Sequence, residues 1–235
     1  MARTPSIPFY YFLHWATLLI NPPSLERYAG PCGDKYAKIE WCPGRVKDTV
    51  EYGPAPLHSW ETLKKAGFDW VDAVVPIQPH AHRAYFFSGE QYVRIDYIPE
   101  TFQEELVGAV RPVSQWNSLK TAGFNTVDAA INVPGATNET YFFCNNKYIR
   151  ASWKEGYGGD KIIEGPKYIA QDWGVTGFNR FDMVLPHPSK PDHAYIFSEK
   201  KYVQVKIVPA LGLTYNNDEK FLSTWLLSIF FFLIW

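Results

Sequence analysis

Four of the six histidines form two local pairs, and their side chains are the best suited in the chain to bind a transition metal. His80 and His82 flank a single alanine, and His187 and His193 lie six residues apart. Neutral imidazole is a common metal ligand and an axial ligand of haem iron. If the fold brings the two pairs together, these four residues form a haem or metal site; otherwise they are solvated loop histidines.

No motif in the sequence is typical of an enzyme. It contains no Ser-His-Asp spacing, no phosphate-cradling glycine loop, no Cys-x-x-Cys pair and no His-Glu-x-x-His. The three cysteines, Cys32, Cys42 and Cys144, are too few for a disulfide framework, and we favour free thiols over a local bridge between Cys32 and Cys42. We therefore expect a binding protein whose fold rests on packing.

Composition narrows the class of partner. The 235 residues include 23 Lys and Arg against 24 Asp and Glu, which gives a net charge of −1. A chain with so little net charge is not expected to bind nucleic acid through nonspecific electrostatic attraction. Hydrophobic residues make up 46% of the chain and aromatic residues 17%, enough for a substantial core. A small molecule or a glycan is the expected partner, and a homodimer stays open.

The elements that position these residues follow from an internal repeat. Three landmarks recur in order: an aspartate within a short apolar run, an aromatic run and a strand that begins with tyrosine. They fall at Asp72, 85–87 and 92–94, then at Asp128, 141–143 and 148–150, and then at Asp182, 195–197 and 202–204. The first step is 56 residues and the second is 54, and a weaker copy begins near Gly33, so four units are visible.

Each intact unit predicts short strands followed by a helix. In the second unit, residues 71–77 are apolar and β-branched, as in a strand buried on both faces. Residues 83–88 and 91–97 flank a glycine-containing turn of hairpin length, so they should pair antiparallel. Along 91–97 the odd-numbered apolar residues should share a buried face, and the even-numbered ones an amphipathic face. Residues 114–122 predict a helix with Ser114 as N-cap, and Gly123 should end it as the C′ residue.

Units of about four strands that recur several times predict an all-β, four-bladed β-propeller with short helices between the blades. The Asp-Ala strand, the aromatic Tyr-Phe-Phe strand and the Gly-x-x-Tyr-x-Arg strand resemble hemopexin-type repeats. Within that family the chain is more similar to the legume seed albumin-2 group and a mushroom lectin than to the C-terminal domains of matrix metalloproteinases. The resemblance implies a ligand-binding module and no catalysis.

Domain boundaries follow from the repeat. We expect a hemopexin-like propeller over 32–221, with first and last blades degenerate or incomplete. Its units should span about 32–70, 71–126, 127–180 and 181–221. The apolar segment within 1–31 is atypical and admits three interpretations: a signal sequence, a degenerate first strand or non-native sequence. The apolar tail 222–235 is short for a membrane span, and it stands where the last outer strand and helix of the fourth blade should be, so we expect those to be missing.

The resemblance also implies ions in the central channel. In such propellers, carbonyl groups at and just after the repeated aspartate ring a bound calcium or sodium ion, with chloride nearby. Carried over to this chain, the positions are Asp72, Asp128 and Asp182, together with Val74, Ala130 and Val184. The alternative is that the aspartates only cap or turn the chain where each blade begins. The fourth position would be Ala16, where the strand pattern is lost.

Two functions from different classes stay open. The first is a non-enzymatic protein with channel ions that binds haem, a polyamine or a sugar. The second is a storage or protein-interaction propeller whose channel ions are only structural. A polyamine would use the acidic groups near the channel mouth, whereas a sugar site would need exposed aromatic side chains with Asn or Asp. The cytoplasm is slightly favoured over secretion.

Overall fold

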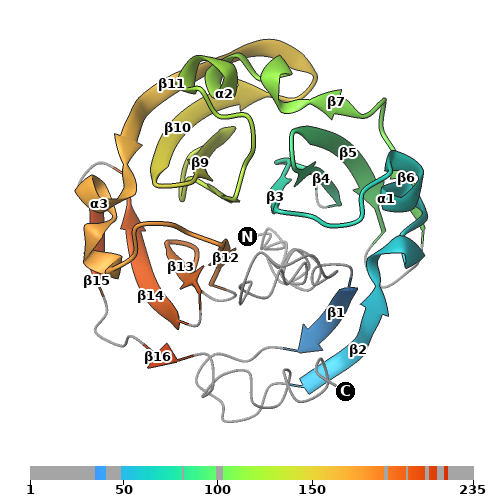
Figure 1. Ribbon diagram of the computed structural model, residues 1–235, viewed down its shortest axis with the longest axis horizontal. Helices are drawn as coiled ribbons and strands as arrows, with labels where there is room; N and C mark the ends of the chain where they lie inside the picture. The colour runs from blue at the N-terminus through green and yellow to red at the C-terminus, as the bar shows by residue number, and fades with distance from the viewer. Residues whose placement is uncertain are drawn as a thin grey trace, which may run out of the picture.

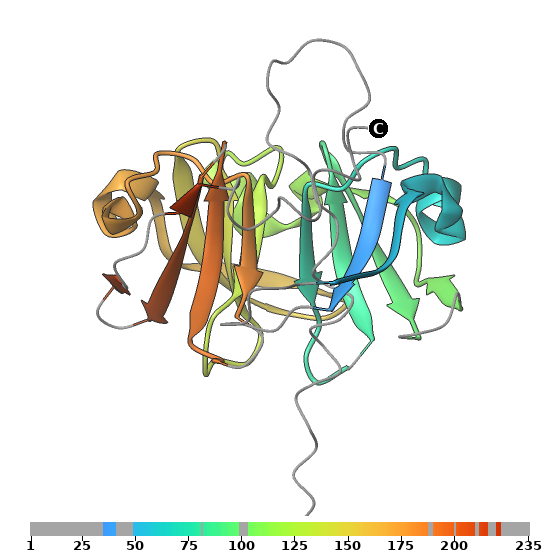
Figure 2. The same ribbon diagram turned by 90° about the horizontal axis from the view of Figure 1, so that it is seen from below.

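Four antiparallel sheets stand around a common axis in the computed structural model (Figure 1). The structure describes residues 35–40, 49–80, 82–98, 103–187, 190–199, 201–209, 212–215 and 220–221. Each sheet is a blade that lies within one repeat unit, and the strands stand roughly along the axis (Figure 2). The four-bladed β-propeller expected from the repeats is confirmed.

The elements follow the repeat along the chain. Blade 1 contains β1 Lys35–Glu40 and β2 Thr49–Pro56, followed by η2 Leu57–Ser59 and α1 Glu61–Ala66. Blade 2 contains β3 Ala73–Pro76, β4 Arg83–Ser88, β5 Gln91–Tyr97, β6 Glu104–Leu106 and β7 Arg111–Pro112, followed by η3 Val113–Gln115 and α2 Asn117–Ala122. Blade 3 contains β8 Ala129–Asn132, β9 Glu139–Cys144, β10 Lys147–Lys154 and β11 Tyr157–Tyr168, followed by α3 Ile169–Asp172 and η4 Gly174–Thr176. Blade 4 contains β12 Met183–Pro186, β13 His193–Ser198, β14 Lys201–Val208, β15 Gly212–Tyr215 and β16 Lys220–Phe221.

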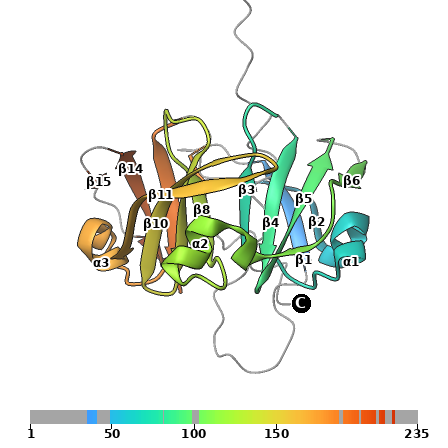
Figure 3. The same ribbon diagram turned by 90° about the horizontal axis from the view of Figure 1, so that it is seen from above.

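The strand order within the blades runs from the axis outwards. In blade 2 it is β3-β4-β5-β6, with β7 paired to the start of β5, and in blade 3 it is β8-β9-β10-β11. Ser88 pairs with Gln91, which confirms the hairpin expected between 83–88 and 91–97. The helices lie on the outer rim between neighbouring blades (Figures 1 and 3).

The hydrophobic core lies between the blades. One cluster joins Tyr85 and Phe87 of blade 2 to Phe142 and Trp153 of blade 3. At its centre lies Trp116, the residue between η3 and α2. A second joins blade 3 to blade 4, and a third joins the end of blade 1 to blade 2. Because each aromatic strand packs against the next blade, burial of apolar surface holds the ring together.

The face alternation expected for β5 is confirmed. Val93, Ile95 and Tyr97 pack in the cluster shared with the end of blade 1. Tyr92 packs in the cluster shared with blade 3, and Arg94 on the same face forms an ion pair with blade 3. Successive side chains of one strand therefore serve two different blade interfaces.

Three local expectations need correction. The helix begins at Asn117 with Trp116 as N-cap, not Ser114, and the carboxylate of Asp160 in β11 accepts bonds from the N–H groups of Asn117 and Ser118 at 3.1 and 2.6 Å. The inner strand β3 is not buried on both faces, because Val74 and Pro76 are half-buried. The outer strand of blade 4 is present as the short β15, which pairs with β14.

The expectations for both ends of the chain lie outside the described residues. These are the segment 1–31, the tail 222–235, the position Ala16, and the cysteines Cys32 and Cys42. In the part of the chain that the structure describes, no helix is both long and apolar enough to cross a membrane.

Candidate functional site

The innermost strands β3, β8 and β12 line the centre of the ring. Among the described strands, each one pairs on one side only, with the next strand of its own blade, so its other edge faces the axis. The strand β8 lies against both β3 and β12. The arrows of β3 and β12 point the same way along the axis, so equivalent residues of the repeat lie at the same height (Figure 2).

The register shows which carbonyl groups of β3 point to the axis. In an antiparallel pair, residues whose N–H and C=O point to the partner strand alternate with residues whose groups point away. The N–H of Ile77 donates to the carbonyl of Arg83 at 2.8 Å, and Val75 pairs with Tyr85. The odd-numbered residues of β3 therefore bond to β4, and the carbonyl of Val74 points to the free edge.

The same register holds in blades 3 and 4. The corresponding hydrogen bonds join Val133 to Glu139 at 2.9 Å and His187 to His193 at 2.8 Å. The carbonyls of Ala130 and Val184 consequently point to the free edges of β8 and β12. Backbone carbonyl oxygens are ligands that a hard cation such as Ca²⁺ accepts. Three blades thus supply carbonyl oxygens, the kind of ligand that the channel-ion prediction requires.

A hydrogen bond between blades shows how closely two of these free edges approach. The next carbonyl along the edge of β3, that of Pro76, accepts a bond of 2.8 Å from the side-chain amide of Asn132 in β8. Thr140 donates to the oxygen of the same amide at 2.8 Å, and the indole of Trp153 donates to Thr140 at 2.8 Å. This chain of bonds fixes the orientation of the amide and ties β3 to β8.

The three repeated aspartates each cap a hairpin turn of their own blade. Oδ2 of Asp72 accepts a bond from the N–H of Gly89, Asp128 from Asn145, and Asp182 from Glu199, at 2.7, 2.7 and 2.6 Å. Each donor residue has a positive φ, of 54°, 54° and 53°. The left-handed turn leaves its N–H without a strand partner, so the carboxylate stabilises the turn. The three aspartates therefore do cap the chain, which was the alternative to ion binding given above for these residues.

The aspartates also come together at one end of the channel. Arg180 lies between Asp128 and Asp182, with its Nη2 3.3 Å from Oδ2 of Asp128 and its Nε 3.6 Å from Oδ1 of Asp182. Burial raises the pKa of the Asp72 carboxyl, while bonds from Gly89 and Trp70 oppose the rise; the charge of Asp128 raises this pKa further and that of Arg180 lowers it. Among the described residues, this end of the channel therefore carries the carboxylates of the three aspartates and the guanidinium of Arg180.

The predicted histidines lie in two separate environments. Nε2 of His80 is 3.2 Å from Oε2 of Glu155 in the turn between β10 and β11, and His82 is exposed. His187 is buried, stacks on Tyr195 with 5.4 Å between ring centroids, and has its ring 6.1 Å from that of His193. Burial, with smaller effects from Lys190 and His193, lowers the pKa of His187 to about 4.

The contacts of the two histidine pairs lie in different blades. His80 faces blade 3, whereas His187 and His193 pack within blade 4. Among the residues that the structure describes, no three His, Cys, Asp or Glu side chains gather closely enough to hold a metal ion. A shared haem or metal site at the four histidines stays a prediction, and the channel-ion prediction depends on carbonyl oxygens.

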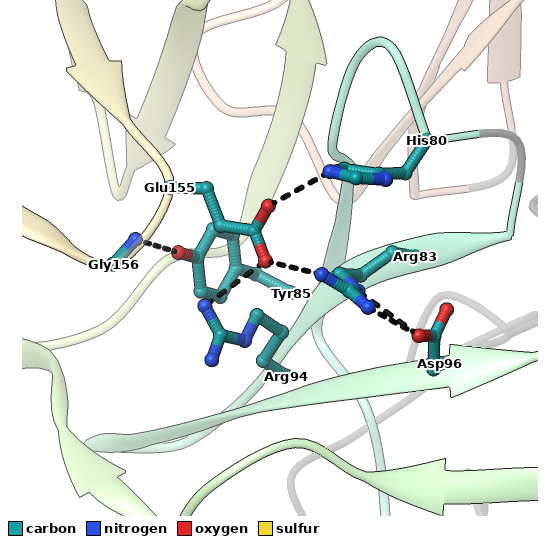
Figure 4. Close-up of polar contacts among 7 residues, drawn as sticks. All are labelled: His80, Arg83, Tyr85, Arg94, Asp96, Glu155 and Gly156. Carbon is teal, nitrogen blue, oxygen red and sulfur yellow. Dashed lines mark hydrogen bonds and ion pairs between the residues drawn. The ribbon is translucent and has the colours of Figure 1, made fainter.

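A cluster of charged side chains surrounds Glu155 and was not expected from the sequence (Figure 4). Oε1 of this residue accepts bonds of 3.0 Å from both Arg83 and Arg94 of blade 2, and Arg83 also binds Asp96. The N–H of Gly156 donates to the hydroxyl of Tyr85 at 3.4 Å. The hairpin tip of blade 3 is thereby fastened to β4 and β5 of blade 2. The one available signal was the arginine repeated at 94 and 150.

Cys144 is buried at the end of β9 and is a free thiol. Burial raises its pKa, and bonds with Thr126 oppose the rise only in part. A raised pKa keeps the sulfur protonated, and a protonated thiol is a poor nucleophile and a poor metal ligand.

Comparisons with known proteins agree with this architecture. No family model matches the sequence. Albumin-2 of Pisum sativum is 21% identical over 198 residues, which cover 60% of this chain and 85% of the relative. Albumin-2 of Lathyrus sativus is 22% identical over 179 residues, which cover 75% of this chain and 78% of the relative.

Solved structures of legume proteins share the fold. The hemopexin fold protein CP4 from cow pea has a TM-score of 0.73 and 22% identity, and covers 84% of this chain and 90% of its own. A Cicer arietinum lectin with two metal binding sites has a TM-score of 0.72 and 24% identity, with 83% and 89% covered. A Cicer arietinum albumin showing hemagglutination has a TM-score of 0.73 and 21% identity, with the same coverage.

The molecule is a four-bladed propeller with the hemopexin fold. Its resemblance to the albumin-2 group, which the repeat motifs indicated, is confirmed by the sequence relatives and by the structural neighbours.

Proposed function

We propose that this chain is a non-enzymatic binding protein that holds a calcium or sodium ion on its channel axis and binds a small ligand or glycan near the channel mouth. The observation that carries the proposal is the set of three carbonyl groups, of Val74, Ala130 and Val184, on the free edges of the inner strands. When bound, the ion offsets the repulsion between carbonyl oxygens that converge on the axis, and it links the blades that supply them.

The neighbours support both halves of this proposal. One related fold belongs to a lectin with two metal binding sites, and another to an albumin showing hemagglutination. Hemagglutination requires contact with a cell surface, where glycans are the abundant ligands. A role in sugar binding therefore has more support here than a role in binding haem or a polyamine.

The competing proposal is a storage or protein-interaction role in which the channel ions are only structural. It is supported by neighbours described as seed albumins. Haem absorbance, polyamine calorimetry and a glycan array on the purified protein separate the two. Binding in any of the three supports the ligand-binding proposal. Three blank results, with a melting temperature that still rises in Ca²⁺, favour storage or interaction.

The haem version of the proposal depends on His80, His82, His187 and His193. If haem binds, replacing all four by alanine should abolish the Soret shift. An unchanged haem affinity in the quadruple variant would remove these residues from the proposal. His80 contacts Glu155 of blade 3, whereas His187 and His193 pack within blade 4, so the haem version has less support than sugar binding.

A further inference from the structure

Trp70 is an exposed aromatic side chain that packing does not require. It lies two residues before Asp72 and is 46% exposed, although large apolar side chains are mostly buried in this core. The equivalent residues of blades 3 and 4 are Thr126 and Arg180, both polar. The repeat therefore folds without an aromatic residue at this position, and the indole of blade 2 is available for another purpose.

The indole is held in one orientation. Its Nε1–H donates to Oδ2 of Asp72 at 3.2 Å, and that oxygen is fixed in turn by the N–H of Gly89. Its Cζ2 lies close to the turn, 3.6 Å from the point that a Cβ on Gly89 would occupy. A side chain that is already ordered loses little entropy when a ligand stacks on it. The polar edge is satisfied, so the ring offers an apolar surface.

Polar groups suited to hydroxyl recognition lie at the same mouth. Oδ2 of Asp72 is engaged, while its Oδ1 has no hydrogen-bond partner among the described residues. Arg180 uses Nη2 and Nε on Asp128 and Asp182, and in the described part of the chain its Nη1 donates to nothing. Asp72, which contacts the indole, therefore offers a hydrogen-bond acceptor, and Arg180 offers a donor at the same end of the channel, where its charge acts on Asp72.

We propose that Trp70, Asp72 and Arg180 form a carbohydrate subsite at the end of the channel where the inner strands begin. This rests on the proposed function, that the chain binds a ligand near the channel mouth. A pyranose has an apolar C–H face that stacks on an indole and vicinal hydroxyls that bond to planar carboxylate and guanidinium groups.

The charge distribution favours a neutral sugar over an organic polycation. A polycation would need several unpaired carboxylates. Two of the three aspartates at this mouth already face the guanidinium of Arg180, which would also repel a second cation. A sugar hydroxyl can instead donate to Asp72 and accept from Arg180 without any loss of charge pairing.

The test compares four proteins on a glycan array and in hemagglutination. Trp70→Thr places the residue type of blade 3 at the site, and Trp70→Phe keeps an aromatic face. Ile163→Thr is the matched control, since Ile163 is 52% exposed on β11 and belongs to no part of the mouth. We expect Trp70→Thr to lose at least about tenfold in affinity, Trp70→Phe to lose much less, and Ile163→Thr to bind as the unmodified protein does.

A second measurement does not depend on the stability of the variants. The indole N–H signal of Trp70, assigned from its loss in Trp70→Phe, should shift when the unmodified protein is titrated with the monosaccharide that inhibits hemagglutination best. An unmoved signal, or full binding by Trp70→Thr, overturns the subsite while the proposed function stands. Spermidine binding that depends on Trp70 overturns the choice of a sugar. No binding to any glycan overturns the sugar-binding proposal itself.

Discussion

Asp128 and Asn145 lie seventeen residues apart in sequence, and a hydrogen bond of 2.7 Å joins the carboxylate of the first to the backbone N–H of the second. The equivalent bond recurs in blades 2 and 4. The aspartate that marks each repeat thus connects the start of a blade to the turn of its central hairpin. Its conformational role is shared by three blades, whereas Arg180 is found at only one of the three equivalent positions.

Removal of this cap should destabilise the protein. We expect Asp128→Ala to lower the free energy of unfolding by about 1 to 2 kcal/mol, because the N–H of Asn145 then loses its charged acceptor. Asp128→Asn keeps an acceptor oxygen and should lose less. Asp69→Ala, at an exposed aspartate of the same chain, should change the stability by less than about 0.5 kcal/mol in urea denaturation. Equal losses in Asp128→Ala and Asp69→Ala would contradict the capping role.

Gly165 should not tolerate a side chain. Its φ is +91°, and a Cβ there would lie 2.7 Å from the carbonyl oxygen of Tyr148 and 3.2 Å from the Cα of Ile149. Since both neighbours are backbone of β10, they cannot move aside without breaking the sheet. We expect Gly165→Ala to cost about 2 to 4 kcal/mol. Gly158→Ala is the control, because a Cβ there meets nothing within 4 Å, and thermal melting should find it close to the unmodified protein.

The Glu155 cluster should stabilise the interface between blades 2 and 3. Glu155→Gln removes the charge that faces Arg83 and Arg94, and the Glu155 side chain is only 18% exposed. We expect a loss of about 1 to 3 kcal/mol, since two partly buried guanidinium groups then lack their shared carboxylate. The exposed Glu105→Gln serves as the control. The measurement is the midpoint of chemical denaturation. If Glu155→Gln and Glu105→Gln have the same midpoint, the cluster contributes no stability.

His187 should make stability depend on pH. Burial lowers its pKa to about 4 in the folded protein, against about 6.5 in the unfolded chain. Below pH 6.5 this histidine is protonated in the unfolded chain but stays neutral in the folded protein. Its contribution to the free energy of unfolding is therefore complete above pH 6.5 and is lost as the pH falls towards 4. The loss from this residue is at most about 3 kcal/mol.

The variant His187→Phe keeps a ring for stacking on Tyr195 but cannot titrate. Its free energy of unfolding should therefore fall less between pH 6.5 and pH 4 than that of the unmodified protein. Above pH 7 the two curves should run parallel, whatever the offset between them. Identical slopes over the acidic range would assign the pH dependence to other groups.

Much of the fold was predictable because it repeats. The spacing of Asp72, Asp128 and Asp182 revealed the blades, and the alternation along 91–97 correctly divided the side chains of β5 between two interfaces. Gly123 ends the helix α2 in the left-handed conformation that its position predicted. These features depend on local sequence, which the repeat presents three times.

What was missed depends on contacts between blades. The helix α2 is capped by Asp160, which lies 43 residues beyond Asn117 in another blade, and nothing near Ser114 reveals this partner. Glu155 lies in a hairpin turn whose length differs from blade to blade, so the repeat could not align it with the arginines that it binds. The pairing of β15 with β14 was missed because that strand does not follow the outer-strand pattern of blade 3.

The channel site is tested most directly by a crystal structure of the protein grown in Ca²⁺, with anomalous scattering used to locate the ion. We expect an anomalous peak on the axis, within coordination distance of the carbonyl oxygens of Val74, Ala130 and Val184. Inner strands whose free-edge carbonyls meet no ion at saturating Ca²⁺, or an ion bound only by surface carboxylates, would contradict this expectation.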